Sequence, residues 1–541
     1  MKGARMTEWR AQVLSDVLAH NAGVRANDEA LVIDGRRLTY GALEERVGEV
    51  ARGLRALGIR RGDHVAVCMG NSVEWVTFFY AAASIGAVTV PVNTRFKADE
   101  LKYCLQQADV KLLLVADRFL KIDFIAMLRE VCAGIDSALP DERLPKLGTV
   151  VVAGRDVPRG ALAYDDMLVL GTTYDAPDLD IALPGDVLLI QYTSGTTSYP
   201  KGVMLTHDNM LRNAAYIAAR IGLGTGDRYY SARPFYHVAG TTLSLLAALT
   251  TGACLISSSH FDPGAALEAL ANERCEFTSG NDTMFLMMLE HADFGKRPLH
   301  IRGGWVSAGP EVSRRVVERM GMRGLCHAYG LSEASPNVSM SRRDDDLQKR
   351  IDGWGHVLDD VEVRIVDPQT QRELPPGTTG EIQVRGWSVM KGYYHLPEQT
   401  AQAIDAQGWL HTGDLGILDE EGRLRFLTRI KDAFRVGGEN VAPAEVEDAL
   451  HAHPAIKQAQ VIGVPDPRLV EVPAAYVILK EGAHATPEEI MDWSKARMAN
   501  FRVPRYVRIV DTFEHIGMTG SAKVQKNKLR AQALIDFGLT G

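Results

Sequence analysis

The chain has 541 residues, of which 46% are hydrophobic and 24% charged, which suits a globular protein of roughly three or four domain-sized units. A net charge of −8 gives no broad basic surface for nucleic acid. The longest apolar runs fall short of the ~20 residues that span a bilayer. We therefore expect no nucleic acid partner and no integral membrane contact. The first 21 residues lack the apolar core of a secretory signal, which favours a cytoplasmic location.

Early segments alternate between helix and strand. Leu43, Val47, Val50, Leu54 and Leu57 recur at steps of four and three, which predicts an amphipathic helix that ends near Gly58. A strand is expected at 63–69, and the small residues of 81–92 suit close packing of a helix and a strand. A further buried strand is expected at 187–190. This alternation indicates a largely parallel sheet with helices on its faces.

Later segments differ in composition. Between about 355 and 430, prolines and glycines separate short β-like runs, which predicts a barrel or a small antiparallel sheet. Beyond 430 we expect a separate small α+β domain, with helices at 444–451 and 487–499 and strands at 459–464 and 474–479. The six cysteines have no C-x-x-C spacing, which argues against a disulfide framework and a zinc site and favours buried thiols.

The polar run 192–202 directly follows the strand expected at 187–190. Its glycines let backbone amides approach an anion, its hydroxyls are donors, and Lys201 supplies a positive charge. The spacing of a Walker loop is absent. On composition alone, a phosphate-binding loop and a polar surface loop are equally good interpretations.

Four further clusters carry chemistry, and each has a simpler alternative. Segment 327–333 pairs an aromatic ring with an acid, which could stack a base and hold a cation. Segment 408–416 places an acid in a glycine-flanked turn that could bind ribose hydroxyls or form an Asx-turn. Segment 429–440 is a charged joint or a solvated face. Segment 518–526 places a lysine on a small-residue loop or in an exposed basic tail.

Taken together, these segments resemble the adenylate-forming superfamily of acyl-CoA synthetases, peptide-synthetase adenylation domains and beetle luciferases. The resemblance covers about residues 38–529. It implies an α/β fold with an N-terminal domain at 1–430, formed by two α/β subdomains and a small distorted β-barrel. A smaller mobile α+β domain would span 431–541, with a hinge at Lys431.

The resemblance also implies the roles of individual residues. ATP phosphates would contact Thr193, Ser194, Gly195, Thr196, Thr197 and Lys201. Adenine would lie between Tyr329 and the backbone of Ser307, Ala308, Gly309 and Pro310, with Gly330 and Ser332 nearby. Mg²⁺ would be held by Glu333 and Thr193, the ribose by Asp414 and Arg429, and the substrate carboxylate would lie beside His237. Lys523 would contact the attacking carboxylate and the α-phosphate, and the loop of Gly437 and Gly438 would approach the pantetheine arm of coenzyme A.

The chemistry explains why such groups are needed. A carboxylate that attacks the α-phosphate of ATP is repelled by it, and cationic and hydrogen-bonding groups must offset this repulsion. No covalent enzyme nucleophile is required. The acyl-adenylate is then attacked by a thiol, and in this family the C-terminal domain swings between the two steps.

The sequence departs from the family pattern at Ser198 and Ala522, where glycine is usual, and at Asn281 and Asp282, where Val-Pro is common. The last pair leads to the hypothesis that a polar or ring-bearing acid is recognised. Its alternative is an Asp cap on a helix at 283–289. An apolar tunnel for medium-chain, alicyclic or aryl acids, or else ordinary core, is expected from Tyr236, Met284, Met287, Trp305, Leu331 and Val338.

Three functions are compatible with these features. An acid:CoA ligase is favoured, because the sequence shows no appended carrier domain after the lysine motif. The alternatives are a stand-alone adenylating enzyme that loads a carrier protein, and a catalytically silent nucleotide-binding module. The expected partners are thus a small carboxylic acid, ATP and coenzyme A, and the resemblance permits a homodimer.

Overall fold

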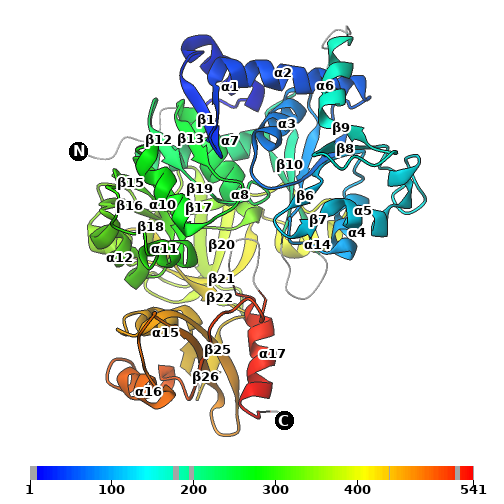
Figure 1. Cartoon of the computed structure of the whole chain (residues 1–541). Coiled ribbons are helices and arrows are strands. Elements are labelled where there is room, and N and C mark those ends of the chain that lie inside the picture. The colour runs from blue at the N-terminus through cyan, green and yellow to red at the C-terminus, as the bar shows by residue number, and fades with distance from the viewer. Residues whose placement is uncertain (1–8, 175–181, 194–199, 438, 518–523, 540–541) are drawn as a thin grey trace.

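The computed structural model describes residues 9–174, 182–193, 200–437, 439–517 and 524–539. These residues form a large body, blue to yellow in Figure 1, above a smaller C-terminal body in orange and red. Among the helices of these stretches, none combines the length and apolar character that a bilayer crossing requires.

The first sheet lies in the N-terminal third of the chain and is mostly parallel, as expected. Its spatial order is β11 (Gly202–Thr206), β10 (Val187–Tyr192), β4 (Val88–Pro91), β3 (His64–Cys68), β5 (Leu112–Ala116), β8 (Thr149–Ala153) and β9 (Leu162–Ala163). Only the pairing of β10 with β11 is antiparallel. The hairpin between these two strands therefore carries the predicted phosphate loop to one edge of the sheet.

Helices cover this sheet because each buries one apolar stripe. Helix α2 (Tyr40–Ala56) buries Leu43, Val47, Val50 and Leu54, and Gly58 follows it with a φ of +82°. The prediction for this segment is confirmed. The other elements around this sheet are α3 (Val73–Ser84), α4 (Ala98–Gln107), β6 (Arg118–Phe119), β7 (Ile122–Asp123), α5 (Phe124–Val131), η1 (Ala133–Asp136) and α6 (Tyr164–Thr172).

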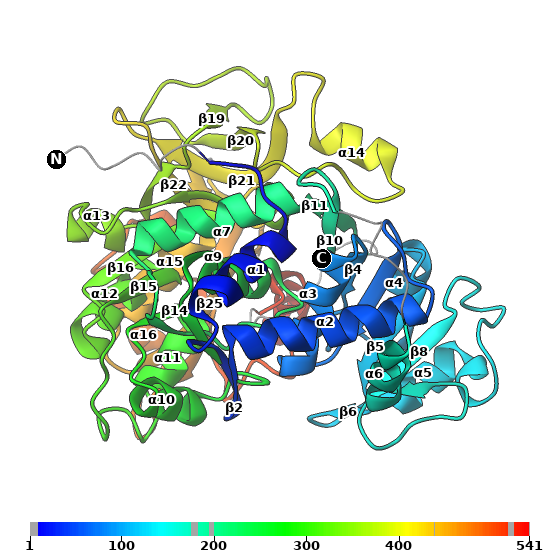
Figure 2. The ribbon, with the colours of Figure 1, turned by 90° about the horizontal axis from the view of Figure 1, so that it is seen from above.

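The second sheet is longer and changes character along its length. Its parallel part consists of β16 (Gly324–Gly330), β15 (Gly303–Ser307), β14 (Phe277–Asn281), β12 (Arg228–Tyr230), β13 (Cys254–Ser257) and β1 (Glu29–Ile33), and β2 (Arg36–Thr39) forms an antiparallel edge. The helices beside it are α1 (Leu14–Arg25), α7 (His207–Ile221), α8 (Val238–Gly240), the π-helix η2 (Thr241–Leu246), α9 (Ala247–Thr251), α10 (Pro263–Asn272), α11 (Asp282–Leu289) and α12 (Pro310–Met320). Seen from above, α1, α2 and α7 lie across the end opposite the C-terminal body (Figure 2).

The segment predicted as a barrel or small antiparallel sheet continues this second sheet. Strands β19 (Val361–Val366), β20 (Gly380–Gly386), β21 (Leu410–Leu418), β22 (Arg423–Arg429), β18 (Trp354–Val357) and β17 (Asn337–Met340) pair antiparallel in that order. Within the described residues this path stays open at β19, so the strands form a sheet and not a closed barrel. The short elements here are η3 (Ser332–Ala334), α13 (Leu347–Ile351) and α14 (Pro397–Ala403).

The C-terminal body is α+β, as predicted. Its sheet has the order β24 (Glu439–Val441), β23 (Phe434–Val436), β26 (Val470–Leu479) and β25 (Ile456–Asp466), and β27 (Tyr506–Ile509) pairs with β26. Its helices are α15 (Pro443–His451), α16 (Pro487–Lys495), η4 (Asn500–Arg502) and α17 (Lys526–Asp536). Helix α16 ends at Lys495, four residues before the predicted Ala499, and the amides of Arg497 and Met498 share the carbonyl of Ser494.

All six cysteines are buried thiols, as expected. The pKa of Cys68 is raised by burial to about 12, so this thiol stays protonated and behaves as a small apolar side chain.

Candidate functional site

The residues predicted to hold adenine and ribose meet where β16 faces β21 and β22. The hydroxyl of Tyr329 donates to Oδ2 of Asp414 at 2.9 Å, and the Tyr329 ring stacks on Phe426 with centroids 5.2 Å apart. Burial and the neighbouring Asp414 raise the pKa of Tyr329 well above its usual value, so its hydroxyl remains a donor. Arg429 is the register partner of Asp414, and its Nε lies 3.6 Å from Oδ1 of that carboxylate. The structure therefore brings these three residues together, and their roles towards a nucleotide stay a prediction.

Backbone packing is close at Gly330, one of the residues predicted to lie near adenine. A Cβ on Gly330 would lie 2.1 Å from the carbonyl oxygen of Pro336, so a side chain at this position would displace the turn that follows β16. That turn contains η3 with Ser332 and Glu333. Because Gly330 has no side chain, the backbone can turn tightly between Tyr329 and Glu333, which are four positions apart in the sequence.

The residues predicted for the phosphate and metal end are linked by a tyrosine. The hydroxyl of Tyr393 donates to Oε1 of Glu333 at 2.9 Å, and Nζ of Lys201 lies 4.8 Å from the centroid of the Tyr393 ring. Burial first, and then the Glu333 carboxylate, raise the pKa of Tyr393, which keeps its proton on the shared hydrogen bond. The amide of Thr193 donates to the carbonyl of Lys201 at 3.1 Å and closes the base of the loop.

Tyr393 is a site residue that the sequence analysis missed. It lies beside β11 because Val203 forms a bridge with it and the amide of Tyr394 donates to the carbonyl of Gly202 at 2.8 Å. The run of Gly392, Tyr393 and Tyr394 was a visible signal, since two consecutive aromatic residues after a glycine are unusual in a polar loop. Nothing in the local pattern pairs this run with a strand almost 190 positions earlier.

Glu333 and Thr193 are suitable ligands for Mg²⁺. Carboxylate and hydroxyl oxygens are the hard donors that this cation prefers, and it commonly keeps waters and phosphates as its other ligands. The hydrogen bond from Tyr393 occupies Oε1 of Glu333 and orients the carboxylate. Among the described residues there is no group of three or more His, Cys, Asp or Glu side chains suited to a metal, so the donor set is sparse.

The segment predicted to face adenine, Ser307 to Pro310, is held by two carboxylates. The amide of Gly309 donates to Oδ1 of Asp282 at 2.8 Å, and the amide of Glu311 donates to Oδ1 of Asp448 at 2.7 Å. Asp448 belongs to α15 of the C-terminal body, whereas Gly309 and Glu311 begin α12 of the large body. A Cβ on Gly309 would lie 2.9 Å from Oδ1 of Asp448, so a side chain there would require the Asp448 carboxylate to shift.

These contacts answer the question raised by Asn281 and Asp282. Asn281 is the cap of α11, because its side chain accepts from the amide of Met284, so the cap lies one residue before the Asp proposed for that role. Asp282 faces Gly309. The described contacts therefore favour a structural role for both residues over direct recognition of the acid.

Replacing Asp282 by asparagine is expected to make stability less dependent on pH. Burial, and then the nearby Glu447 and Asp448, raise the pKa of Asp282 to about 6 from a usual value near 4, while the amide of Gly309 opposes the rise. A raised carboxyl pKa contributes stability below pH 4 that is lost as the pH rises through 6. Thermal unfolding between pH 4 and 8 should show Asp282→Asn gaining about 1–3 kcal/mol over the parent above pH 6.

Asp448 and the charged groups around it also contribute to the dependence of stability on pH in this region. The pKa of Asp448 is raised by burial, with Glu311 adding to the rise and the Glu311 amide, Arg314 and Arg425 opposing it. Asp293→Asn is the matched control, since Asp293 pairs with Lys296 on the surface and should give no comparable change. An equal pH dependence of Asp282→Asn and the parent protein would contradict the assignment.

His237 lies at the start of α8 and not in the core. Its Nδ1 accepts from the amide of Ala239 at 3.1 Å, and the side chain is exposed. With Nδ1 acting as acceptor, a neutral ring carries its proton on Nε2. This geometry directs a donor away from the helix, as a contact with a substrate carboxylate would require.

The predicted hinge lies in a tight turn between β22 and β23. The amides of Asp432 and Ala433 both donate to the carbonyl of Arg429 at 3.0 Å, which places Lys431 at the tip. Partial burial and the neighbouring Arg429 lower the pKa of Lys431. Gly437 follows β23, and its amide donates to the carbonyl of Leu469 at 2.9 Å, so this contact is within the C-terminal body.

Several predicted site residues lie outside the described residues. They are Ser194, Gly195, Thr196, Thr197, Gly438 and Lys523, together with Ser198 and Ala522. Lys526 begins α17, whose first turn is the end of that helix nearer the large body (Figure 1).

Most of the side chains predicted for the acyl tunnel are buried. Trp305 is 2% exposed and Val338 is fully buried, and Tyr236 and Met284 are also covered. Met287 differs from them, because it is 37% exposed. It lies three positions after Met284 in α11, and so towards the same side of the helix, and its place in the tunnel stays a prediction.

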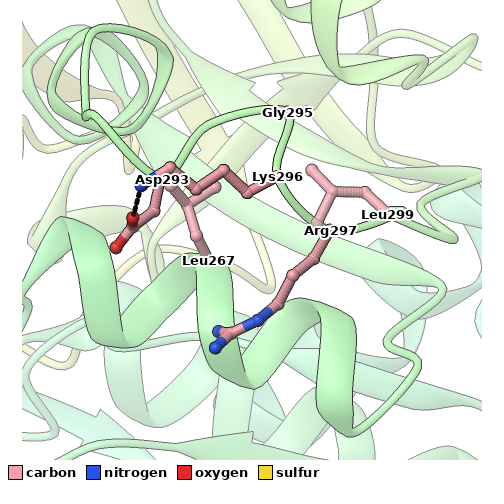
Figure 3. A pocket seen from close by; sticks show the side chains of 6 residues that line it. All are labelled: Leu267, Asp293, Gly295, Lys296, Arg297 and Leu299. Carbon is pink, nitrogen blue, oxygen red and sulfur yellow. Dashed lines mark hydrogen bonds and ion pairs between the residues drawn. The ribbon is translucent and has the colours of Figure 1, made fainter.

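Two surface hollows lie away from these residues. One of about 80 Å³ lies between α10 and the loop after α11, where Lys296 pairs with Asp293 at 2.7 Å (Figure 3). The other, of about 370 Å³, is lined by residues that follow β3, β5 and β8, including Gly70, Phe119 and Gly154. Neither hollow is lined by a residue predicted to bind the nucleotide, the metal or the acid.

Comparisons with known proteins agree with this geometry. A family model described as AMP-binding enzyme matches residues 18–394, and one described as AMP-binding enzyme C-terminal domain matches residues 445–523. The chain is 38% identical to YngI of Bacillus subtilis (strain 168), whose name provisionally calls it an acyl-CoA synthetase, over 99% of this chain and 100% of that protein. It is 35% identical to the mitochondrial medium-chain acyl-CoA ligase ACSF2 of Bos taurus, over 94% of this chain and 85% of that protein.

A solved structure extends the likeness to three dimensions. The anthranilate CoA ligase AuaEII in complex with anthranoyl-AMP has a TM-score of 0.86 and 26% identity, and the match covers 98% of each chain.

Proposed function

The chain belongs to the adenylate-forming acyl-CoA synthetases of the AMP-binding enzyme family, and from this premise we propose that it activates a medium-chain, alicyclic or aryl carboxylic acid. The protein is an AMP-forming acid:CoA ligase. In the first step a carboxylate oxygen attacks the α-phosphorus of ATP and the bond to pyrophosphate breaks. In the second step a thiol sulfur attacks the acyl carbon, the thiol proton is released, and AMP leaves.

One arrangement carries the assignment of the nucleotide site. The ribose end, Tyr329 with Asp414 and Arg429, and the phosphate end, Glu333 with Tyr393 and Lys201, are joined by the single turn from β16 to η3. Asp414 supplies two acceptor oxygens for ribose hydroxyls, and Arg429 helps to orient them. Lys201 supplies positive charge where the phosphate loop begins β11.

The two cofactors that accompany ATP have distinct sites in this proposal. Glu333 and Thr193 would hold Mg²⁺, which when bound neutralises phosphate charge. Coenzyme A would be admitted after the C-terminal domain, residues 431–541, rotates about Lys431 and brings the Gly437 loop towards the large domain. The short turn at 429–433 supports a hinge there, since it joins β22 to β23 and hinges are a few residues at the ends of such elements.

The acid class rests on the buried apolar side chains and on the relatives. We propose that Trp305, Tyr236 and Met284, all of them buried, contribute to an apolar wall of the acyl pocket. The bovine relative is named for medium-chain acids, and the solved neighbour is named for an aryl acid. We propose that His237 orients the reacting carboxylate through its Nε2 proton.

A panel of carboxylic acids tests this proposal. Purified protein with ATP, Mg²⁺ and coenzyme A should release AMP with at least one medium-chain, alicyclic or aryl acid. If AMP were released only when a carrier protein is added, the acceptor would be the carrier protein and not coenzyme A. If the protein bound ATP but showed no pyrophosphate exchange with any acid, the proposal would be contradicted. A cytoplasmic location and a homodimer are further proposals, which cell fractionation and light scattering would test.

A further inference from the structure

Arg233 is a buried arginine that leaves two of its three guanidinium nitrogens without a hydrogen bond among the described residues. It is 7% exposed, and its Nε and Nη2 atoms make no hydrogen bond. It lies between β12 and α8, four residues before His237. A guanidinium is costly to remove from water, and buried charges are normally paired or hydrogen-bonded. An unpaired buried charge of this kind therefore requires an explanation.

The neighbours of Arg233 do not neutralise it. Its guanidinium carbon lies 4.2 Å from the centroid of the Trp305 ring, and the Trp305 indole donates to the hydroxyl of Tyr229 at 2.8 Å. Burial raises the pKa of Tyr229, so that phenol is neutral near pH 7. Burial also lowers the pKa of Arg233 to about 10, with Tyr229 opposing the change, and this value still leaves the guanidinium charged near neutral pH.

The unpaired atoms of Arg233 form the edge of the guanidinium that binds carboxylates elsewhere in this chain. Three other arginines use the same Nε and Nη2 pair to hold both oxygens of one carboxylate: Arg61 with Asp186, Arg129 with Asp136, and Arg385 with Glu362. Two parallel N–H donors match two carboxylate oxygens in distance and direction. The chemistry of the vacant edge thus selects a carboxylate over a single acceptor.

Arg233 contacts a residue of the proposed acyl pocket, the ring of Trp305. Trp305 belongs to the wall of the proposed acyl pocket, and His237 on the same segment is proposed to hold the reacting carboxylate. Hydroxyl groups near this segment add polar character, since Ser231 and Ser244 are hydrogen-bonded at 2.8 Å and Tyr229 donates to Ser279 at 3.0 Å. Arg233 and these hydroxyl groups are thus polar groups close to the buried ring of Trp305.

We propose that Arg233 binds a second carboxylate of the acid substrate, so that this ligase activates a dicarboxylic acid by its far carboxyl group. The inference rests on the proposed acyl pocket and narrows its substrate class. One carboxylate would pair with the Nε and Nη2 edge of Arg233, and the other would be adenylated near His237. The apolar ring of Trp305 would contact the hydrocarbon part between them.

Local structure does not depend on the Arg233 side chain. Its carbonyl accepts from the Asn71 side chain at 2.9 Å, a backbone contact that any residue provides. Arg350 gives a direct contrast: it is also 7% exposed, but its side chain donates to the carbonyls of Asp345, Arg323 and Leu325. Arg350 therefore supports the fold through three hydrogen bonds, whereas the Arg233 guanidinium packs on the ring of Trp305 and leaves Nε and Nη2 without an acceptor in the described part of the chain.

Matched pairs of acids provide the test. Pyrophosphate exchange is measured for straight-chain and aromatic dicarboxylic acids and for their monomethyl esters, which keep the shape and lose one charge. The parent protein should favour the best diacid over its ester by about 10²-fold in kcat/KM. Arg233→Met should abolish most of this preference by lowering diacid activity about 10²-fold while ester activity stays within about threefold.

Further variants separate binding from folding. Arg233→Lys should restore only part of the preference, because an ammonium group cannot donate along a fixed two-point edge. Arg233→Met should unfold at or above the temperature of the parent protein, since an apolar side chain replaces an unpaired buried charge, whereas Arg350→Met should unfold earlier. If Arg233→Met fails to fold, the activities with diacids and with their esters are compared in Arg233→Gln and Arg233→Lys instead.

Clear outcomes would overturn the inference. A parent protein that favours monocarboxylic acids or esters over every diacid would do so, as would an Arg233→Met variant with an unchanged ratio. If no acid at all is activated, the proposed function fails, and Arg233 is then tested alone by the thermal shift that diacids produce. Equal shifts in the parent and in Arg233→Met would show that the edge binds no dicarboxylate.

Discussion

Replacing Lys523 by methionine is expected to lower the rate of adenylate formation by about 10²–10³-fold, the usual cost of removing one donor aimed at charge that develops in a transition state. The resemblance places this lysine on the attacking carboxylate and the α-phosphate, where two anions are forced together. Methionine keeps the length of the side chain and removes its charge. Pyrophosphate exchange measures the loss directly.

The same variant should retain most of the second step. Conversion of a synthetic acyl-adenylate to acyl-CoA does not require the adenylation lysine, so its rate should change by no more than about threefold. Lys526→Met is the matched control, because Lys526 pairs with Glu447 at 2.7 Å inside the C-terminal body and should affect stability and not catalysis. An equal loss in both half-reactions would show that Lys523 acts through folding or domain position.

Replacing Glu333 by glutamine is expected to reduce adenylation by about 10²-fold at a fixed Mg²⁺ concentration. The amide oxygen still accepts the hydrogen bond from Tyr393, which is 2.9 Å from Oε1, so the change removes charge and little else. Raising the Mg²⁺ concentration should recover part of the activity if the carboxylate holds the cation. The measurement is the initial rate of pyrophosphate release across a Mg²⁺ titration.

Two controls bracket this result. Tyr393→Phe removes the orienting hydrogen bond and retains the charge, so it should cost only about three- to tenfold. Glu362→Gln removes an exposed carboxylate paired with Arg385 and should leave the Mg²⁺ dependence unchanged. A Glu333→Gln variant that needs no more Mg²⁺ than the parent would exclude a metal-holding role.

The sequence was most informative where local pattern and local structure coincide. The apolar stripe from Leu43 to Leu54 became α2, because its periodicity decides which face of the helix is covered, and the short apolar run at 187–190 became the buried strand β10. The order of the motifs placed Tyr329, Asp414 and Arg429 together although 85 residues separate the first two. Recognition of the whole set, and not the strength of any single motif, made that possible.

The errors and omissions share a physical cause. The contact of Tyr393 with Glu333 depends on the pairing of Val203 with a segment far along the chain, and Asp448 reaches Gly309 from another domain. Within the residues that the structure describes, Nε and Nη2 of Arg233 lack an acceptor because of how the surrounding residues pack. Such relations are set by tertiary packing, which a linear pattern of residue types does not encode.

Helix α12 has no side-chain cap of its own, since Gly309 stands at its N-cap position and the acceptor for Glu311 comes from Asp448 across the domain boundary. A cap is worth about 0.5–2 kcal/mol, so rotation of the C-terminal domain would expose the amide at the start of α12 at that cost. Because Ser307 to Pro310 lead into this helix, we expect the grip on adenine to loosen when Asp448 withdraws. The position of the C-terminal domain would then affect the affinity for the nucleotide. The rotation that admits the thiol would therefore also favour the release of AMP.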